Sequence, residues 1–107
     1  MFLGLFSKNK YKQISTKQLK EEYLNDKSNN YFLDVRTKGE YKANHIRGFE
    51  NISVDKLEAN LGKIPKNKEV VVICQSGGRS SMACGLLSRH GYENVTNVVG
   101  GMNNWIY

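Results

Sequence analysis

The sequence predicts one α/β domain with a mainly parallel central sheet that helices flank on both faces. Short apolar runs at residues 31–35, 69–73 and 95–99 alternate with segments of helical periodicity, which is typical of βαβ units. The run at 69–73 is apolar almost throughout, as expected for a parallel strand that is buried on both faces. A chain of 107 residues is long enough for one hydrophobic core and too short for two.

The first half of the chain contains two capping signals. Residues 10–14 favour a short strand, and the Ser-Thr-Lys-Gln stretch that follows has the spacing of a capping box, so we expect a helix over residues 15–24. An apolar second strand at 31–35 ends in Asp-Val. It is followed at 37–40 by Thr-Lys-Gly-Glu, a second capping box that predicts a short helix.

The second half repeats the alternation of strands and helices. We expect a short strand at 51–52, then a helix over 53–61 that Ser53 caps. After the central strand, a helix is predicted over 80–90, where a glycine stops it, and a last strand over 95–99. Two glycines then turn the chain into a terminal helical turn within residues 100–107.

The positive charge of the chain is spread along it. The net charge is +6, with six basic and three acidic residues in 1–30 and ten basic and seven acidic residues in 31–107. Nucleic-acid binding requires a dense basic stripe, so we expect no nucleic-acid partner. A general attraction of small anions is the milder consequence.

The cysteine count and the N-terminus suggest where the protein acts. Two cysteines at 74 and 84 are too few for a disulfide framework and have no metal-site spacing, which favours a reducing, cytoplasmic location. Residues 1–9 form a short apolar arm, far below the ~20 residues of a membrane span, so no transmembrane segment is expected. A weak interfacial anchor is the alternative for this arm. Residues 10–107 are expected to form the single domain.

The strongest functional signal is the passage from residues 70–73 into Cys74 and on to Arg79. The pattern predicts a strand, a tight loop and a helix, and the backbone amides of such a loop converge on its centre. Gly77 and Gly78 permit positive φ, and Arg79 is expected to supply a fixed cation at the helix entrance. This environment lowers the pKa of a thiol, so Cys74 is a candidate nucleophile. The alternative is a buried cysteine that only fills space at the end of a core strand.

Four segments resemble the single-domain rhodaneses, which are sulfurtransferases. Residues 34–41 resemble the DVR…E(F/Y) segment of that family, and residues 44–52 resemble its GHI.GA.NI segment. Residues 74–80 fit its C-x-x-G-x-R-S loop, and residues 100–105 fit its closing GG…W. The segments occur in the family's order and span nearly the whole chain.

The resemblance implies a rhodanese-like fold and sulfur transfer through a persulfide on Cys74, without metal or organic cofactor. The implied donor is thiosulfate or a persulfide, and the acceptor is cyanide or a thiol, a protein thiol included. Cys74 would be catalytic. The residues expected around the transferred sulfur are Gln75, Ser76, Gly77, Gly78, Arg79 and Ser80.

Two other classes remain open at this point. A cysteine-dependent phosphatase or arsenate reductase uses a similar cradle, but those enzymes have five residues between cysteine and arginine, whereas four separate Cys74 from Arg79. A smaller ring of amides leaves room for one sulfur atom and disfavours a tetrahedral oxyanion. An inactive recognition module would be expected only if the nucleophile were replaced.

The remaining candidate residues are expected to be mostly structural. His90 should cap the far end of its helix, and the resemblance makes His45 structural, so neither is expected to act as a general base. Cys84 is expected in the core, with a resolving thiol as the alternative. Arg36 and Glu40 are four residues apart, which is the spacing of a surface ion pair, and the resemblance gives them a role in holding the loop beneath the site.

Overall fold

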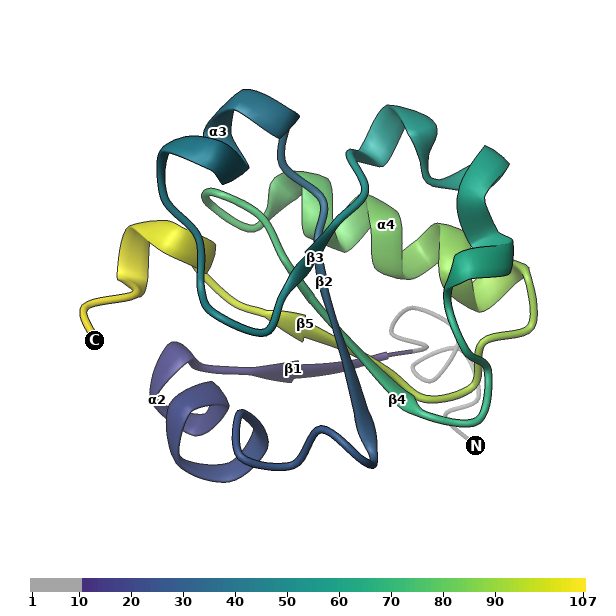
Figure 1. Cartoon of the computed structure of the whole chain (residues 1–107). Coiled ribbons are helices and arrows are strands. Elements are labelled where there is room, and N and C mark those ends of the chain that lie inside the picture. The colour runs from purple at the N-terminus through teal and green to yellow at the C-terminus, as the bar shows by residue number, and fades with distance from the viewer. Residues whose placement is uncertain (1–10) are drawn as a thin grey trace, which may run out of the picture.

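A computed structural model describes residues 11–107, which form a sheet of five parallel strands surrounded by short helices (Figure 1). The strand order is β1-β5-β4-β2-β3, and every pairing is parallel. The predicted parallel sheet is therefore confirmed. The strands are β1 (Lys12–Ile14), β2 (Asn30–Asp34), β3 (Glu50–Asn51), β4 (Glu69–Ile73) and β5 (Val95–Val98).

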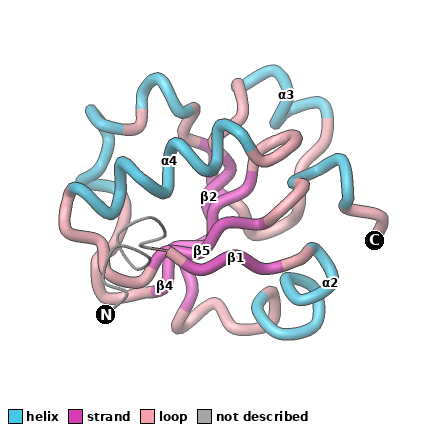
Figure 2. The backbone as a smooth tube through the Cα atoms, turned by 180° about the vertical axis from the view of Figure 1, so that it is seen from behind, coloured by secondary structure: helices cyan, strands magenta, loops and turns pink. Residues whose placement is uncertain are grey.

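Helices cover both faces of this sheet, as Figures 1 and 2 show from opposite sides. One face packs against α4 and the two 3₁₀ helices η2 and η3, and the other packs against η1, α3 and η4. None of the helices within residues 11–107 is long and apolar enough to cross a membrane. The helices are α2 (Thr16–Gln18), the π-helix η1 (Leu19–Tyr23), α3 (Lys38–Ala43), η2 (Val54–Lys56), η3 (Glu58–Lys63), α4 (Gly78–Arg89) and the 3₁₀ helix η4 (Gly101–Asn104).

Strand β4 links the two halves of the core. Successive side chains of a strand point to opposite faces, and here Val70 and Val72 pack in one cluster with Leu87 of α4. Val71 packs in the other cluster with Leu19 of η1. All of these side chains are fully buried. The apolar run that predicted a strand buried on both faces is thus explained by packing on each side.

Both predicted capping boxes are present. Ser15 Oγ accepts from Gln18 N at 3.0 Å, and Gln18 Oε1 accepts from Ser15 N at 3.0 Å. Thr37 and Glu40 make the same reciprocal pair at the start of α3. The first helix differs from the prediction after one turn, because it widens into a π-helix in which Leu24 N donates to Leu19 O at 3.0 Å.

The helix predicted over residues 53–61 is instead two 3₁₀ helices, η2 and η3. Ser53 makes no side-chain capping bond, and Asn60 leaves the helical region at φ −119° and ψ 19°. The Asn60 amide donates to the carbonyl of Lys56 at 2.8 Å, and such side-chain bonds compete with the backbone pattern of an α-helix. The predicted helix over 80–90 also starts earlier, at Gly78. The predicted arm at residues 1–9 lies outside the described residues.

Candidate active site

Cys74 lies directly after β4, at the carboxyl edge of the sheet, where ligands bind in parallel α/β folds. Strands β2 and β5 pair with β4 on its two sides, so this position is central in the sheet. We call residues 74–80 the cradle, since they connect β4 to the first turn of α4. The Cys74 side chain is nearly buried, with 1% of its surface exposed.

The Cys74 sulfur has hydrogen-bonding partners on the cradle itself. Gly77 N donates to Sγ at 3.0 Å, and Ser80 Oγ lies 3.3 Å from Sγ. Burial raises the pKa of this thiol, but hydrogen bonds from the Ser80 hydroxyl and from the backbone amides of Ser80, Gly77 and Ser76 outweigh it and lower the pKa. The cradle therefore favours the thiolate, which is the nucleophilic form of a cysteine.

The Ser80 hydroxyl lies between the Cys74 sulfur and a backbone carbonyl. In the thiol form Sγ–H donates to Ser80 Oγ, and the Ser80 hydroxyl donates to Gly77 O at 3.1 Å. A thiolate only accepts, and rotation of the Ser80 hydroxyl would turn its hydrogen toward Sγ. The N-cap of α4 is Gly77, so the Ser80 hydroxyl does not cap the helix. Ser80 is fully buried, and its hydroxyl lies beside the Cys74 sulfur.

The two glycines of the cradle differ in their geometry. Gly77 has a positive φ of +114°, as expected, and a Cβ there would lie 3.5 Å from Gly100 N. Gly78 was also expected to use this freedom, but it is the first residue of α4 and its φ is not positive. A Cβ at Gly78 would meet no atom within 4 Å. Only the turn at Gly77 needs glycine for its backbone conformation.

The Arg79 guanidinium is held by a carboxylate of α3. Its Nη1 and Nη2 donate to the two Glu40 oxygens at 2.8 and 3.0 Å, and Thr37 N donates to Glu40 Oε1 at 2.9 Å. The hydrogen bond from Arg79 is the main reason that the pKa of Glu40 falls to about 2. The pKa of Arg79 is raised mainly by its hydrogen bond to Glu40, and the charge of Cys74 is also among the causes that raise it. The Arg79 cation therefore joins the cradle to α3 and interacts electrostatically with the thiolate.

Beneath the cradle lies a buried ion pair of Asp34 and Arg36. Arg36 Nε and Nη2 donate to the Asp34 carboxylate at 2.8–3.1 Å, and both residues are at most 3% exposed. Arg36 also donates to Asn44 O at 2.6 Å and to Gln75 Oε1 at 3.3 Å. The expected side-chain pair of Arg36 with Glu40 is not formed, because Arg36 reaches only the Glu40 carbonyl, at 3.4 Å. The expected support of the cradle from beneath is present, through the contact of Arg36 with Gln75.

The start of η4 closes the cradle from the side of β5. Met102 N donates to Cys74 O and Asn103 N donates to Gln75 O, both at 2.9 Å. Gln75 Nε2 donates to Asn103 Oδ1 at 2.7 Å. A Cβ at Gly101, whose φ is +56°, would overlap the Cys74 carbonyl and lie 2.9 Å from the carbonyl carbon of Gln75. The sequence assigned the paired glycines to a turn, and their close approach to the cradle was not predicted.

The histidines and the second cysteine have structural positions. His45 Nδ1 lies 2.8 Å from Tyr41 O, and its ring stacks on that of Tyr41 at 3.8 Å. His90 is the C-cap of α4, and its Nε2 lies 3.2 Å from Glu58. Cys84 is fully buried, and burial raises the pKa of its thiol well above the usual range. Within residues 11–107, these histidine contacts do not include Cys74.

Residues 15–107 match the family described as the rhodanese-like domain. The chain belongs to the rhodanese-like domain family. Solved rhodanese-like structures superpose well on it: a rhodanese-like domain protein from Staphylococcus aureus is 33% identical with a TM-score of 0.80, covering 89% of this chain and 91% of that one. The protein SSP1007 from Staphylococcus saprophyticus is 34% identical, also with a TM-score of 0.80, and the match covers 89% and 93% of the two chains.

Named relatives of this rhodanese-like domain include two sulfurtransferases. A sulfurtransferase from Allochromatium vinosum is 31% identical, over 87% of this chain and 86% of that protein. The thiosulfate sulfurtransferase GlpE from Coxiella burnetii is 33% identical, over 89% of this chain and 87% of that protein. The Bacillus subtilis protein YrkF is 38% identical over 87% of this chain, and there the match spans only half of the relative, 50%.

Proposed function

We propose that this rhodanese-like domain is a sulfurtransferase that carries sulfane sulfur as a persulfide on Cys74. The supporting observation is the surroundings of Sγ at the carboxyl end of the central strand, where Gly77 N donates to Sγ at 3.0 Å and the Ser80 hydroxyl lies 3.3 Å from it. Two relatives with similar coverage are named sulfurtransferases, one of them a thiosulfate sulfurtransferase. Sulfur transfer of the rhodanese type fits both the family and the geometry.

The proposed reaction has two displacement steps. The Cys74 thiolate attacks the outer sulfur of thiosulfate, a new S–S bond forms, and the donor S–S bond breaks as sulfite leaves with the electron pair. A small persulfide donor would react in the same way, with a thiolate as leaving group. Cyanide or a thiolate acceptor then attacks the terminal sulfur, and Cys74 leaves as the thiolate. The two steps balance without a redox partner or a metal.

The cradle amides would hold the terminal sulfur between these steps. The loop amides face the position of Sγ, and the start of α4 adds partial positive charge. A persulfide anion carries its charge one bond beyond Sγ, so we propose that the amides from Gln75 to Ser80 surround that atom. Arg36 below and Asn103 beside the loop would keep Gln75 in place through its side chain. Preorganised donors of this kind cost little reorganisation during the reaction.

Two features disfavour a phosphatase or arsenate reductase. The cradle has four residues between Cys74 and Arg79, so its ring is smaller than that of the C-x5-R enzymes. The Arg79 guanidinium also already forms a bidentate ion pair with Glu40, at 2.8 and 3.0 Å. A tetrahedral oxyanion would have to displace that carboxylate to gain bidentate contact with the guanidinium. Sulfur transfer needs no such displacement.

Turnover assays separate the two classes. The wild type and Cys84→Ser are expected to produce thiocyanate from thiosulfate and cyanide, and Cys74→Ser is expected to produce none, because the buried Cys84 thiol is far from ionised. None of the three proteins should hydrolyse an aryl phosphate. Phosphate release that depends on Cys74, together with no transfer from any sulfur donor, would overturn the proposal in favour of the phosphatase.

The setting that we propose is a reducing compartment such as the cytoplasm. Both cysteines are free thiols, and Cys74 must stay reduced to accept sulfur. A small-molecule donor and either a small thiol or a protein thiol as acceptor are the proposed partners.

A further inference from the structure

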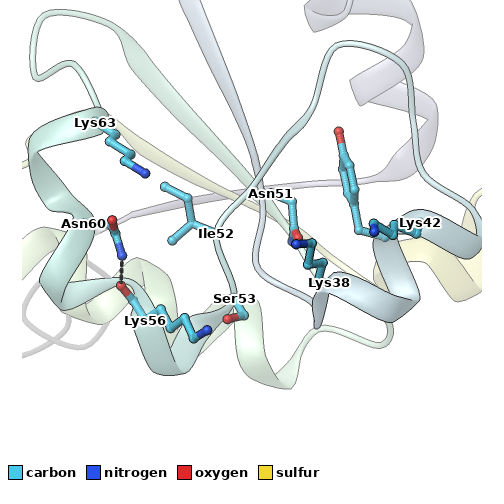
Figure 3. Close-up of a pocket in the computed structure, with 9 residues that line it drawn as sticks. Lys38, Lys42, Asn51, Ile52, Ser53, Lys56, Asn60 and Lys63 are labelled. Carbon is cyan, nitrogen blue, oxygen red and sulfur yellow. Dashed lines mark hydrogen bonds between the residues drawn. The ribbon is translucent and has the colours of Figure 1, made fainter.

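A groove of about 440 Å³ lies between α3 and the two 3₁₀ helices η2 and η3 (Figure 3). Four of its lining residues are lysines. Lys38 and Lys42 of α3 stand on one side of the groove, and Lys56 and Lys63 stand on the other, with Asn51 and Ile52 between them. The remaining lining residues are neutral. We call this site the lysine groove.

The charge of the lysine groove is not compensated by ion pairs. The ion pairs found within residues 11–107 do not include any of its four lysines, whose side chains are all exposed. Among the acids of the walls, Glu40 pairs with Arg79 and Glu58 pairs with His90. Asp55 of η2 lies next to Lys56 and interacts with its charge, so one carboxylate stands against four lysines. Like charges gathered around a concave surface focus the field and attract anionic partners.

The lysine groove is a neighbour of the cradle across α3. Lys38 and Lys42 are one turn apart, and Glu40, two residues from each, projects to the cradle and binds Arg79. One helix width, about 10–12 Å, therefore separates the two sites. They also share a support, because Asn51 on the groove floor donates to the carbonyls of Asp34 and Arg36 at 3.0 and 2.9 Å.

We propose that the lysine groove docks an acidic protein surface that presents the acceptor thiol to the Cys74 persulfide. This inference rests on the proposed function and names its acceptor. Cys74 is only 1% exposed, so a thiol has to be directed at its sulfur. A typical protein interface buries about 800 Å² per partner, which is more than enough to cover both sites at once.

The chemistry of the groove favours a protein surface over a small ligand. Pockets for small molecules usually carry a small number of precisely placed polar groups, whereas four of the nine residues that line this groove are lysines. Two lysines on each wall match carboxylates that are spread over a protein surface. Charge complementarity of this kind speeds encounter and fixes orientation.

The test uses a synthetic acceptor peptide. It has one cysteine, a flexible linker of four residues and six glutamates, and its control carries glutamines in place of the glutamates. Four extended residues span about 13–14 Å, enough to cross α3. The rate of sulfur transfer from the persulfidated protein is measured for both peptides at low and high salt.

We expect the acidic peptide to react about tenfold faster than its neutral control, and we expect salt to reduce the difference. The double variant Lys56→Glu with Lys63→Glu should lose this preference. Both lysines are on the wall away from the cradle, so transfer to cyanide should be unchanged. The matched control is Lys17→Glu with Lys27→Glu, which makes the same charge change at exposed positions on and after α2. It should keep the preference.

A binding measurement distinguishes failure of this inference from failure of the proposed function. The acidic peptide with serine for cysteine should bind Cys74→Ser protein, and Lys56→Glu with Lys63→Glu should abolish that binding without any sulfur chemistry. Binding without persulfide formation in the wild type would refute the acceptor role and the proposed function together. Equal rates and equal binding for the two peptides would overturn the docking proposal alone. Tripolyphosphate binding to the groove without peptide binding would also overturn it, in favour of a small-anion site.

Discussion

Replacing Ser80 by alanine removes a hydroxyl that lies 3.3 Å from the Cys74 sulfur and is fully buried beside it. A hydrogen bond to an ionised group contributes about 1.5–3 kcal/mol, and each ~1.4 kcal/mol is a factor of ten. The thiolate fraction at a pH below the thiol pKa should therefore fall by about 10- to 150-fold in Ser80→Ala.

In Ser80→Ala, the rate of persulfide formation should fall less than the thiolate fraction does. A thiolate of higher pKa is more nucleophilic, with a Brønsted slope of about 0.4–0.5, so persulfide formation should slow by roughly 3- to 20-fold. The assay is single-turnover sulfite release from thiosulfate, followed across a pH range that spans the ordinary thiol pKa of ~8.5. The pH–rate profile of Ser80→Ala should move to higher pH, and at high pH the variant should equal or exceed the wild type.

Ser81→Ala is the matched control on the same turn of α4. The Ser81 hydroxyl accepts from Asn97 Nδ2 at 3.3 Å, away from the thiol. Its profile should overlay that of the wild type. If Ser80→Ala loses rate with no shift of the profile, the Ser80 hydroxyl only supports packing and the reasoning on thiolate stabilisation is refuted.

Two further predictions concern the surroundings of the cradle. Gly101→Ala should reduce the free energy of unfolding by more than about 1 kcal/mol, because its Cβ would overlap the Cys74 carbonyl at positive φ. Gly78→Ala has open space around the new Cβ, so its free energy of unfolding should be unchanged or rise by about 0.4–1 kcal/mol. Equal urea midpoints for the two variants would contradict this prediction. Glu40→Gln should lower stability by only about 0–1 kcal/mol at neutral pH, since both side chains of the Arg79 pair are about a third exposed (34% and 35%). The pKa of Glu40 is depressed from 4.5 to about 2, so the pair stabilises the fold fully above pH 4.5 and this contribution is lost as pH falls through the folded-state pKa. A difference in stability from wild type that is undiminished at pH 2 would refute the assignment.

The sheet and the capping boxes could be predicted because their signals are local. The apolar run of β4 and the spacing of Thr37 and Glu40 depend on neighbours in the sequence, and both behave as expected. The position of Cys74 in the fold could be predicted for the same reason, since the end of a strand, a glycine turn and a helix start are consecutive in the chain. The 3₁₀ helices at residues 53–61 could not be predicted in this way. They are accompanied by a side-chain hydrogen bond from Asn60, which the hydrophobic periodicity of the sequence does not reveal.

Contacts between distant segments could not be predicted. The four-residue spacing of Arg36 and Glu40 favours a pair with each other, but the fold brings Arg79 within 3.0 Å of Glu40 from 39 residues away. Arg36 turns instead to Asp34, where a bidentate partner satisfies a buried guanidinium. The closure of the cradle by Gly101 and the gathering of four lysines around one groove likewise arise from tertiary placement.

The central claim is that Cys74 itself carries the transferred sulfur, and intact-mass spectrometry after incubation with thiosulfate tests it most directly. The wild type and Cys84→Ser should each gain the mass of one sulfur atom, which cyanide then removes, and Cys74→Ser should gain nothing. A sulfur adduct that persists in Cys74→Ser, or no adduct on the wild type from either thiosulfate or a small persulfide donor, would contradict the claim.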